Sequence, residues 1–272
     1  MSISTHSLCV NLGTKEVLQQ VNVHIEQGSS VAIIGPNGCG KSTLLRALCG
    51  VLKPNSGFVQ VDGANLQAQS KLSLAKKIGL LSQSSSVPPM LSVREHVSLG
   101  RHPHRSYRSR NPVLDRLVVQ DAISTCRLDD LSDRPIEQLS GGERQRVRIA
   151  TLLAQQTDIL LLDEPMNGLD IEHQYDLLAL ISKLKQFDNK TVIAVLHDLS
   201  MAMTHFEQII IMDNGVIVSD GPPQSTINTE IISSVFQVNA TISYDNHMTK
   251  PFVTYEPKSS LPNYSKNQET TA

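Results

Sequence analysis

The sequence predicts an α/β protein with a largely buried parallel sheet. Two features of its 272 residues indicate this fold class. Short apolar runs alternate along the chain with segments whose apolar residues recur at helical spacing, which is the pattern of strands covered by helices. One of these runs also leads directly into a glycine-rich turn and then a helix-period segment. The length suits one large domain or two small ones.

The strands are expected at the apolar runs, in residues 31–34, 58–61, 159–162, 192–196, 209–212 and 216–218. The first run is the candidate central strand, and Gly50 ends the helix that follows it. Asp62-Gly63 ends the second run as a turn, and Asp213-Asn214-Gly215 between the last two runs predicts a hairpin. A further helix is predicted between residues 162 and 192 from one apolar stripe, made of Leu177, Leu178, Ile181 and Leu184.

From about residue 88 the chain changes character. Residues 88–136 lack β-branched strand runs, and prolines and polar residues there surround five arginines: Arg101, Arg105, Arg108, Arg110 and Arg116. We therefore expect a mostly helical subdomain, inserted at about residues 88–155 in a domain that covers residues 1–257. A solvated helical face is the favoured interpretation of the arginines, with partner contacts as the alternative. Residues 258–272 are polar and predict a disordered tail.

Charge and composition exclude several classes of protein. With 24 Lys and Arg against 26 Asp and Glu, the net charge of −2 lacks the basic excess of a general nucleic-acid or anionic-membrane binder. Apolar residues make up 40% of the chain, too many for wholesale disorder. The apolar runs are far shorter than the ~20 residues that span a bilayer, and the start of the chain lacks a secretory pattern. Four scattered cysteines predict reduced thiols, so a cytosolic protein is expected.

The glycine-rich turn after residues 31–34 matches the phosphate-binding pattern G-x-x-x-x-G-K-[ST]. Its glycines let successive backbone N–H groups point at phosphate oxygens, and the following helix N-terminus adds partial positive charge. Lys41 can reach the β- and γ-phosphates, and the Ser42 hydroxyl can ligate Mg²⁺. A chance glycine turn is the alternative, but the strand before it and the helix after it argue against chance. The predicted nucleotide site includes Gly35, Pro36, Asn37, Gly38, Cys39, Gly40, Lys41, Ser42 and Thr43.

Two adjacent carboxylates follow the apolar run at residues 159–162. Asp163 and Glu164 would stand at the carboxyl end of a buried strand, where ligands of α/β sheets bind. Asp163 would hold Mg²⁺, commonly through water, and Glu164 would polarise an attacking water as general base. Alone, the pair could equally be an acidic helix cap; beside a phosphate loop we interpret it as functional.

The segment Leu139-Ser140-Gly141-Gly142-Glu143-Arg144-Gln145 indicates a family. Ser140, followed three residues later by Glu143, predicts a capped helix start, and the two glycines make a second place for a γ-phosphate. A chain with a phosphate loop, this segment and an acidic strand in this order resembles the ATP-binding-cassette (ABC) ATPases, over about residues 5–255. The resemblance implies a P-loop NTPase core with an antiparallel β subdomain and the inserted helical subdomain.

The resemblance also implies how a nucleotide is held. Two copies of the chain would pair head-to-tail. ATP and Mg²⁺ on the Lys41 loop of one copy would then be closed over by Ser140, Gly141 and Gly142 of the other. Such a homodimer would carry two composite sites.

Three more residues match functional positions of the family. Gln83 would sense Mg²⁺ and the γ-phosphate. Asp170 belongs to the loop that would cross the dimer interface. His197 would contact the γ-phosphate and hold the attacking water. The resemblance therefore implies Glu164, His197 and Gln83 as catalytic residues, and Ser42, Gln83 and Asp163 as the metal site.

Several residues depart from the family pattern. Leu12, before Gly13, stands where the family often has an aromatic residue that stacks on adenine, so loose base selectivity is expected. Glu143 replaces a common glutamine, and Met166-Asn167 replaces a hydroxyl-bearing pair at the dimer interface. Cys39, inside the phosphate loop, is interpreted as a small residue rather than a redox sensor. Its alkylation is expected to inactivate the ATPase unless ATP protects it.

The detailed pattern is similar to the ATPase subunits of bacterial importers of ferric siderophores, with haem and cobalamin importers as close alternatives. It is carried by the phosphate loop, by Leu99-Gly100-Arg101 and by residues 194–199. The resemblance implies a homodimer at the cytoplasmic face of the inner membrane, docked to separate integral-membrane permease subunits and served by a substrate-binding protein, without nucleic acid. Residues 84–100 would line the groove for the permease. An exporter ATPase, a soluble ABC ATPase and a P-loop kinase remain as further alternatives.

Overall fold

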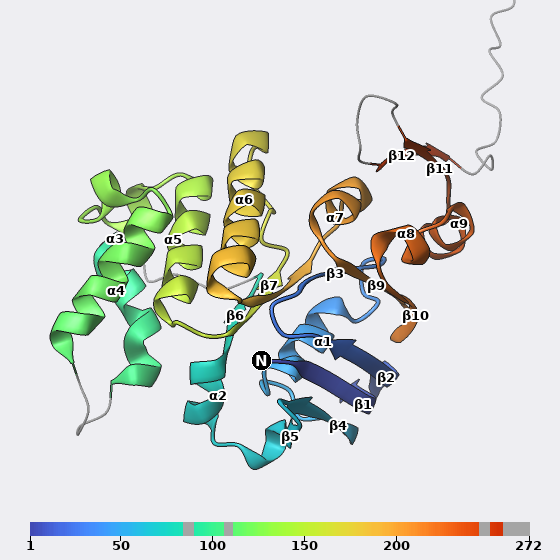
Figure 1. Ribbon diagram of the computed structural model, residues 1–272, viewed down its shortest axis with the longest axis horizontal. Coiled ribbons are helices and arrows are strands. Elements are labelled where there is room, and N and C mark those ends of the chain that lie inside the picture. The colour runs from blue at the N-terminus through green and yellow to red at the C-terminus, as the bar shows by residue number, and fades with distance from the viewer. Residues whose placement is uncertain (84–89, 106–110, 245–250, 258–272) are drawn as a thin grey trace, which may run out of the picture.

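The computed structural model describes residues 1–83, 90–105, 111–244 and 251–257, and its strands form two main sheets (Figure 1). Arg108, Arg110, residues 258–272 and the first part of the expected permease groove, residues 84–89, lie outside these ranges. Among the described residues, no helix is both long enough and apolar enough to cross a bilayer.

A six-stranded sheet forms the centre of the molecule. Its strand order is β10 (Val216–Gly221), β9 (Gln208–Asp213), β3 (Ser30–Ile34), β8 (Thr191–Val195), β7 (Ile159–Asp163) and β6 (Ile78–Leu81). Neighbours from β9 to β6 are parallel, and β10 returns antiparallel to β9. β3, β7 and β8 are buried along their whole length because both faces of the sheet are covered. The predicted strands are confirmed, with residues 31–34 inside the sheet; the sequence pattern missed β6, which contains Gly79.

A four-stranded antiparallel sheet makes up the other strand layer. Its order is β2 (Lys15–Ile25), β1 (Ile3–Leu12), β4 (Ser56–Val61) and β5 (Ala64–Asn65). Along β2, Val21, Val23 and Ile25 are buried and the residues between them are exposed, so one face of the sheet meets the core. The helix α1 (Lys41–Leu48) packs in the same core cluster as these strands. This sheet beside a parallel one confirms the predicted fold class.

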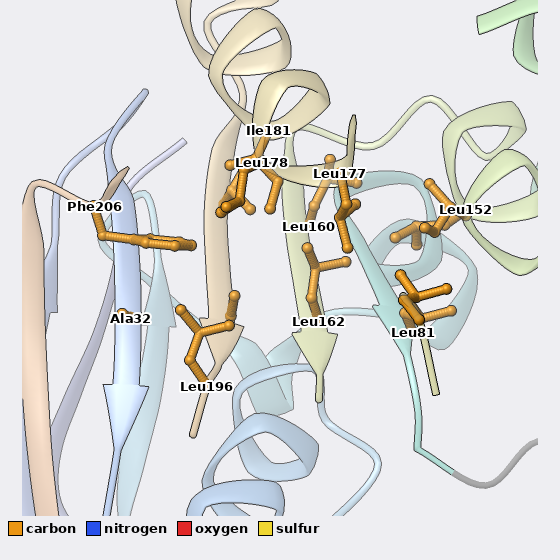
Figure 2. Close-up of a cluster of buried hydrophobic side chains, with 14 of the residues drawn as sticks. Ala32, Leu81, Leu152, Leu160, Leu162, Leu177, Leu178, Ile181, Leu196 and Phe206 are labelled. Atoms are coloured by element: carbon orange, nitrogen blue, oxygen red, sulfur yellow. The ribbon is translucent and has the colours of Figure 1, made fainter. Parts of the chain in front are cut away.

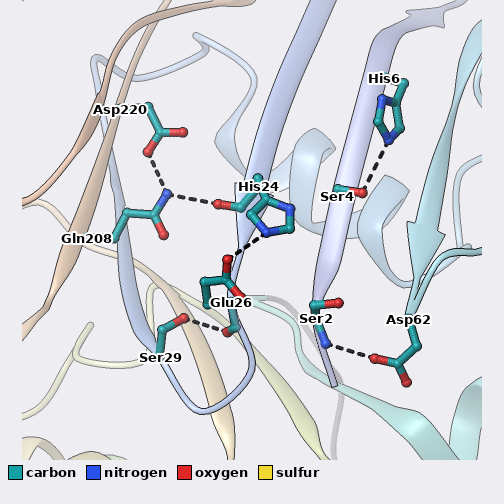
Figure 3. Close-up of polar contacts among 9 residues, drawn as sticks. All are labelled: Ser2, Ser4, His6, His24, Glu26, Ser29, Asp62, Gln208 and Asp220. Carbon is teal, nitrogen blue, oxygen red and sulfur yellow. Dashed lines mark hydrogen bonds and ion pairs between the residues drawn. The ribbon is translucent and has the colours of Figure 1, made fainter.

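Polar side chains fasten the two sheets where their ends meet (Figure 3). Gln208, at the start of β9, donates from Nε2 to Asp220 Oδ1 of β10 at 2.6 Å and to the His24 carbonyl of β2 at 3.1 Å. Burial raises the pKa of Asp220, and the hydrogen bond from Gln208 opposes that rise. The amide of Ser2 donates to Asp62 Oδ1 at 2.9 Å, which ties the first strand to the turn after β4. The Gln208 contact thereby joins β2 of the antiparallel sheet to β9 of the six-stranded sheet, whereas the Ser2 contact lies within the antiparallel layer.

The elements between β6 and β7, in the residues that the structure describes there, are all helical. They are α3 (Val93–Ser98), α4 (Pro112–Thr125) and α5 (Gly141–Ala154), with short 3₁₀ helices at Leu99–His104, Asp129–Leu131 and Ile136–Gln138. The three α-helices lie together on one side of the molecule (Figure 1). Ser92 starts α3 and Ser140 starts α5, each through a capping box with the glutamate three residues later. The boundaries of the inserted subdomain and of the whole domain stay predictions.

Arg101 corrects the expectation that the arginines of this part form a solvated face. It is only 2% exposed, and its Nε donates to Asp115 Oδ1 of α4 at 2.8 Å. Its Nη1 donates to the carbonyl of Ala154, at the end of α5, also at 2.8 Å. A buried guanidinium is tolerated here because several acceptors replace its water. Arg101 therefore joins three segments of the helical part, whereas Arg105 and Arg116 are exposed.

The apolar core covers both faces of the six-stranded sheet. On one face, Leu160 and Leu162 of β7 meet α6 (Ile171–Asp188), whose predicted apolar stripe points at the sheet (Figure 2). On the other face, Ile159 and Leu161 pack in the cluster that contains α1 and the antiparallel sheet. Because successive strand residues point to opposite faces, one strand contributes to both clusters. β7 is thus a rigid support for the residues that follow it.

The remaining elements precede, connect or follow strands of the six-stranded sheet. α2 (Lys71–Lys77) leads into β6, and α7 (Leu199–His205) leads from β8 toward β9. After β10 come α8 (Pro223–Thr226), α9 (Thr229–Phe236) and a hairpin of β11 (Val238–Tyr244) and β12 (Pro251–Pro257). The hairpin packs on α7, where the Val253 amide donates to Ser200 Oγ at 3.1 Å. The sequence pattern did not indicate this hairpin.

Candidate functional site

Three neighbouring strands deliver predicted residues to the same edge of the parallel sheet. β6, β7 and β8 are hydrogen-bonded neighbours that run in one direction, so their carboxyl ends meet. Gln83 follows β6, Glu164 follows β7 and His197 follows β8. The strand order therefore brings together side chains from distant segments, and 81 positions separate Gln83 from Glu164.

The Glu164 carboxylate is the centre of this cluster. Its Oε2 accepts a hydrogen bond from Gln83 Nε2 at 2.6 Å, and its Oε1 lies 2.9 Å from His197 Nε2. The Glu164 side chain is only 12% exposed, whereas that of His197 is 44% exposed. The carboxylate is thus held by donors on two sides, and the histidine lies toward the solvent. A water beside these two groups could be both oriented and deprotonated.

Glu164 also has an uncommon backbone conformation. Its φ is 51°, in the left-handed region, which costs a non-glycine residue about 1–3 kcal/mol. The turn that follows it places the Asn167 amide group so that Nδ2 donates to Glu164 Oε2. Sequence reasoning treated Asn167 only as a departure at the dimer interface and missed this contact. The spacing of three residues beyond a carboxylate was the available signal, because it is the spacing of a turn.

The predicted phosphate loop connects β3 to α1 as the pattern requires. Gly38 and Gly40 have φ values of 79° and 112°, which favour glycine. A Cβ on Gly35 would lie 2.1 Å from the Met212 carbonyl oxygen, and one on Gly40 would lie 3.1 Å from that of Val17. Neighbouring backbone therefore leaves no room for a side chain at Gly35, and at Gly40 the positive φ and the close neighbours disfavour one. The contacts that favour glycine in this loop are therefore made within one copy of the chain.

Lys41 lies against this loop. The residue is 5% exposed, and its Nζ donates to the carbonyls of Gly35 at 2.7 Å and Pro36 at 2.9 Å. An ammonium group held over a ring of backbone amides is suited to polyphosphate. Beside it opens a cavity of about 760 Å³. Its lining includes nine predicted residues: Asn37, Gly38, Gly40, Lys41, Ser42, Thr43, Gln83, Glu164 and His197.

Ser42 and Asp163 form a pair of hard oxygen ligands at the base of this site. Ser42 Oγ donates to Asp163 Oδ1 at 2.8 Å, and Asp163 is 2% exposed. A buried carboxylate beside a hydroxyl, next to a phosphate loop, is a donor set that Mg²⁺ prefers. The residues present therefore fit the predicted metal.

The Ser140 segment lies at the N-terminus of α5, outside that cavity. Ser140 Oγ accepts from the Glu143 amide at 3.2 Å, and Glu143 Oε2 accepts from the Ser140 amide at 2.7 Å. These hydrogen bonds lower the pKa of Glu143. A Cβ on Gly141 would meet no atom within 4 Å in the part of the chain that the structure describes, and one on Gly142 would meet only Leu169, at 3.8 Å. One copy of the chain thus does not bring these residues to its own phosphate loop.

Asp170 also lies outside the cavity and starts α6. It accepts a hydrogen bond from the His173 amide at 3.1 Å, and its pKa is lowered by the bonds from His173. Like Ser140, Asp170 is an exposed helix cap. Neither residue lines the cavity of its own chain.

Two sequence departures have clear places. Leu12 is 46% exposed and lines the cavity together with Lys15 and Val17, which sequence reasoning did not single out. Cys39 is 4% exposed, and burial raises the pKa of its thiol although Lys41 opposes the rise. Its side chain packs in the core cluster under the loop and does not line the cavity. The interpretation of Cys39 as a small packing residue agrees with this position.

Known sequences resemble this one over nearly its whole length. A family model described as "ABC transporter" matches residues 18–167. The iron(3+)-hydroxamate import ATP-binding protein FhuC of Bacillus subtilis (strain 168) is 36% identical over 256 residues, which is 94% of this chain and 95% of that protein. The ferric enterobactin transport ATP-binding protein FepC of Escherichia coli (strain K12) is 40% identical over 246 residues, covering 90% and 91%.

Solved structures resemble the fold. A metal-chelate type ABC transporter in an inward-facing conformation superposes with a TM-score of 0.80 at 27% identity, covering 94% of this chain and 96% of that chain. A dimeric ATP-binding cassette in a post-hydrolysis state with ADP and phosphate superposes with a TM-score of 0.72 at 29% identity, covering 81% and 98%. Sequence and fold therefore point to one family.

Proposed function

The chain belongs to the family of ABC transporter ATP-binding proteins and is an ATPase of that family, and from this premise we propose that it powers the import of a ferric siderophore. The observation that carries the transport assignment is likeness over the full chain to ATP-binding proteins of iron(3+)-hydroxamate and ferric enterobactin transport, not over the ATPase motifs alone. The Glu164 cluster beside the phosphate loop is the observation that supports the assignment of hydrolysis to particular residues.

The phosphates of ATP bind on the loop at residues 35–43. Backbone amides of the loop and the first turn of α1 face the β- and γ-phosphates, and Lys41 moves its ammonium from the Gly35 and Pro36 carbonyls onto them. Leu12 and Val17 offer the adenine an aliphatic surface at the cavity wall. This binding is the same for any nucleoside triphosphate, so the base contributes little selectivity.

Mg²⁺ would be held by Ser42 and Asp163, with Gln83 as the third residue that senses it. Bound there, it would neutralise charge on the β- and γ-phosphate oxygens. Ser42 Oγ and Asp163 Oδ1, now 2.8 Å apart, would be the two protein oxygens nearest such an ion. The buried position of Asp163 keeps its carboxylate oriented toward the loop.

Hydrolysis is assigned to Glu164, His197 and Gln83. Glu164 accepts a proton from the water that attacks the γ-phosphorus, and the bond from that phosphorus to the β–γ bridging oxygen breaks. His197 and Gln83 orient the water and the γ-phosphate, because both side chains already contact the Glu164 carboxylate. The left-handed backbone at Glu164 supports this role, since strain of that kind persists where the surrounding structure fixes a side chain for a purpose.

The complete site contains a second copy of the chain. Ser140, Gly141 and Gly142 of the partner copy would cover the γ-phosphate, and its Asp170 loop would cross the interface. The open space over Gly141 supports this assignment, because the described chain supplies nothing for it to contact. A γ-phosphate that joins two copies favours the closed dimer, and its removal by hydrolysis ends that preference.

The dimer would act at the cytoplasmic face of the inner membrane, docked to separate permease subunits. A substrate-binding protein would deliver the ferric siderophore on the other side. Closing and opening of the dimer would move the docked permease between two conformations. Residues 90–100, the described part of the predicted permease groove, are the surface we assign to that contact.

Two measurements test this assignment in the organism that encodes the chain. The first is purification of tagged Glu164→Gln protein from its membranes with ATP, using Lys41→Ala as the control that lacks the nucleotide. Recovery of a polytopic membrane protein supports the importer, whereas a complex without any membrane subunit contradicts it.

The second measurement is uptake by a strain that lacks the chain, complemented with wild type or Glu164→Gln. Loss of ⁵⁵Fe uptake from a hydroxamate or catecholate siderophore supports the proposal. Intact siderophore uptake combined with loss of haem or cobalamin uptake transfers the function to that alternative substrate.

A further inference from the structure

A polar bridge joins α5 to both loops that carry catalytic side chains. It consists of Arg148 and Gln145, which lie on α5 one turn apart. Arg148 Nη1 donates to Gln145 Oε1 at 2.8 Å, so the two side chains also hold each other. Gln145 ends the segment that indicated the family, but neither residue is among those predicted to contact the nucleotide.

One end of the bridge holds the loop after β6. Arg148 Nη2 donates to the carbonyl of Ser82 and lies 3.4 Å from the carbonyl oxygen of Gln83. A contact that holds these carbonyls fixes the backbone of the loop, and with it the position from which the Gln83 side chain extends. Arg148 is half-buried, and burial lowers its pKa, so the guanidinium has lost water that these carbonyls replace.

The other end of the bridge holds the loop after β7. Gln145 is 7% exposed, and its Nε2 donates to the carbonyl of Pro165 at 2.8 Å. Pro165 directly follows Glu164, and Gln83 Nε2 donates back to Glu164 Oε2. The contacts therefore close a ring that runs from Glu164 through Gln83, Arg148 and Gln145 to Pro165.

This ring has a mechanical consequence, because α5 is also the helix that begins at Ser140. A rigid helix transmits a displacement of its N-terminal end to residues two turns along it. We propose that Arg148 and Gln145 are positioning residues that set the place of Gln83 relative to Glu164, so that hydrolysis depends on where α5 lies. The proposal deepens the assignment of hydrolysis above and rests on it.

The test uses the purified full-length chain and three variants. Arg148→Met removes the donors and keeps most of the side-chain volume, and Gln83→Ala removes the group that Arg148 positions. Arg127→Met is the matched control: Arg127 follows α4 and donates from Nη1 to Asp176 Oδ2 of α6 at 3.1 Å, so its loss removes a guanidinium contact of the helical part without reaching the Gln83 loop. Turnover at saturating ATP and the Kd for ATP without Mg²⁺ are measured for each, and for the double variant of Gln83 and Arg148.

Arg148→Met is expected to lower turnover by about tenfold to a hundredfold, because small displacements in a catalytic group are that costly. Its Kd for ATP should match that of the wild type, since the phosphate loop is untouched. In the Gln83→Ala background the same change should lower turnover by less than about twofold, because both variants remove one interaction. Arg148→Lys should recover part of the loss, and Arg127→Met should leave turnover unchanged.

Three results would overturn the proposal: full turnover in Arg148→Met, an equal proportional loss in the Gln83→Ala background, or the same loss in Arg127→Met. Failure of the underlying assignment looks different. If Gln83→Ala itself hydrolyses ATP at the wild-type rate, the catalytic role of Gln83 is wrong, and the bridge has no group to position.

Discussion

The two glycine-rich segments of this chain differ in what surrounds them. At Gly35, the Met212 carbonyl oxygen would lie 2.1 Å from an added Cβ, so the fold itself requires glycine. At Gly141, an added Cβ would meet nothing within 4 Å among the described residues. Packing within one chain therefore requires the first glycine, whereas nothing described in the chain requires the second. Glycine at Gly141 needs another reason, and we propose that the reason is the nucleotide bound to a second copy.

The largest effect is expected at Glu164, which lies beside the phosphate loop and is assigned the chemistry. Glu164→Gln removes the proton acceptor and keeps a side chain of the same shape, so turnover should fall by about 10²–10⁴-fold. ATP affinity should be preserved, because Lys41 and the loop do not change. Turnover and equilibrium nucleotide binding on the purified protein check this. Near-normal turnover would refute the role of Glu164 as base.

A substitution at Gly141 should have a different effect from one in the phosphate loop. Gly141→Ala meets no obstacle in its own chain, and alanine favours a helix start more than glycine does, so the thermal midpoint should be unchanged or slightly raised. ATP-dependent dimers of Glu164→Gln protein should nevertheless disappear when Gly141→Ala is added, as measured by light scattering. Dimers that persist with full ATPase activity in the single variant would show that this surface does not meet a nucleotide.

The matched substitution at Gly35, in the phosphate loop, should lower the stability of the fold. Gly35→Ala forces its new methyl group against the Met212 carbonyl, an overpacking that costs about 1–3 kcal/mol. The thermal midpoint should therefore fall by several degrees, and ATP binding should weaken. Thermal unfolding of Gly35→Ala beside Gly141→Ala measures the contrast directly. Equal midpoints would mean that the loop relaxes and that packing does not explain its first glycine.

The reactivity of the Cys39 thiol tests how tightly the phosphate loop is packed. Its thiol is 4% exposed and its pKa is raised by burial, so at a given pH it holds less reactive thiolate than an ordinary cysteine. Alkylation should be about tenfold slower than at the half-buried Cys9, should accelerate as the pH is raised beyond the usual thiol range, and should inactivate only as Cys39 is modified. Peptide mass spectrometry against residual ATPase activity tests this. Rapid labelling of Cys39 would contradict the packing role.

The smallest effect is expected at Glu143, in the capping box that starts α5. Hydrogen bonds from Ser140 lower the pKa of Glu143 in the folded chain, so its contribution to stability is present above the unfolded pKa and is lost as the pH falls through the folded one. Because Glu143 stays partly exposed to solvent, Glu143→Gln should cost only about a few tenths of a kcal/mol at neutral pH. The difference from wild type in denaturant unfolding should vanish in acid. A difference that grows in acid would contradict the direction of the shift.

Local patterns were sufficient for much of the fold. The apolar runs placed five of the strands of the parallel sheet, and Gly50 and Asp62-Gly63 marked real ends of elements. They failed where the signal depends on context: β6 is short and contains Gly79, and Arg101 looked solvated because an arginine among prolines and polar residues carries no sign of its buried partner, Asp115. A periodicity reports which face of an element is apolar, but not which charged groups will find each other.

The sequence by itself determined the phosphate loop, the carboxylate pair after β7 and the capped start of α5, because each is encoded by residues close together whose backbone needs are local. Only the tertiary structure decided that Gln83, Asn167 and His197 converge on Glu164, and that Arg148 and Gln145 tie those loops to α5. The physical reason is strand order. Which loops share a sheet edge follows from non-local pairing of β6, β7 and β8, and that pairing is a property of the whole core rather than of any short segment.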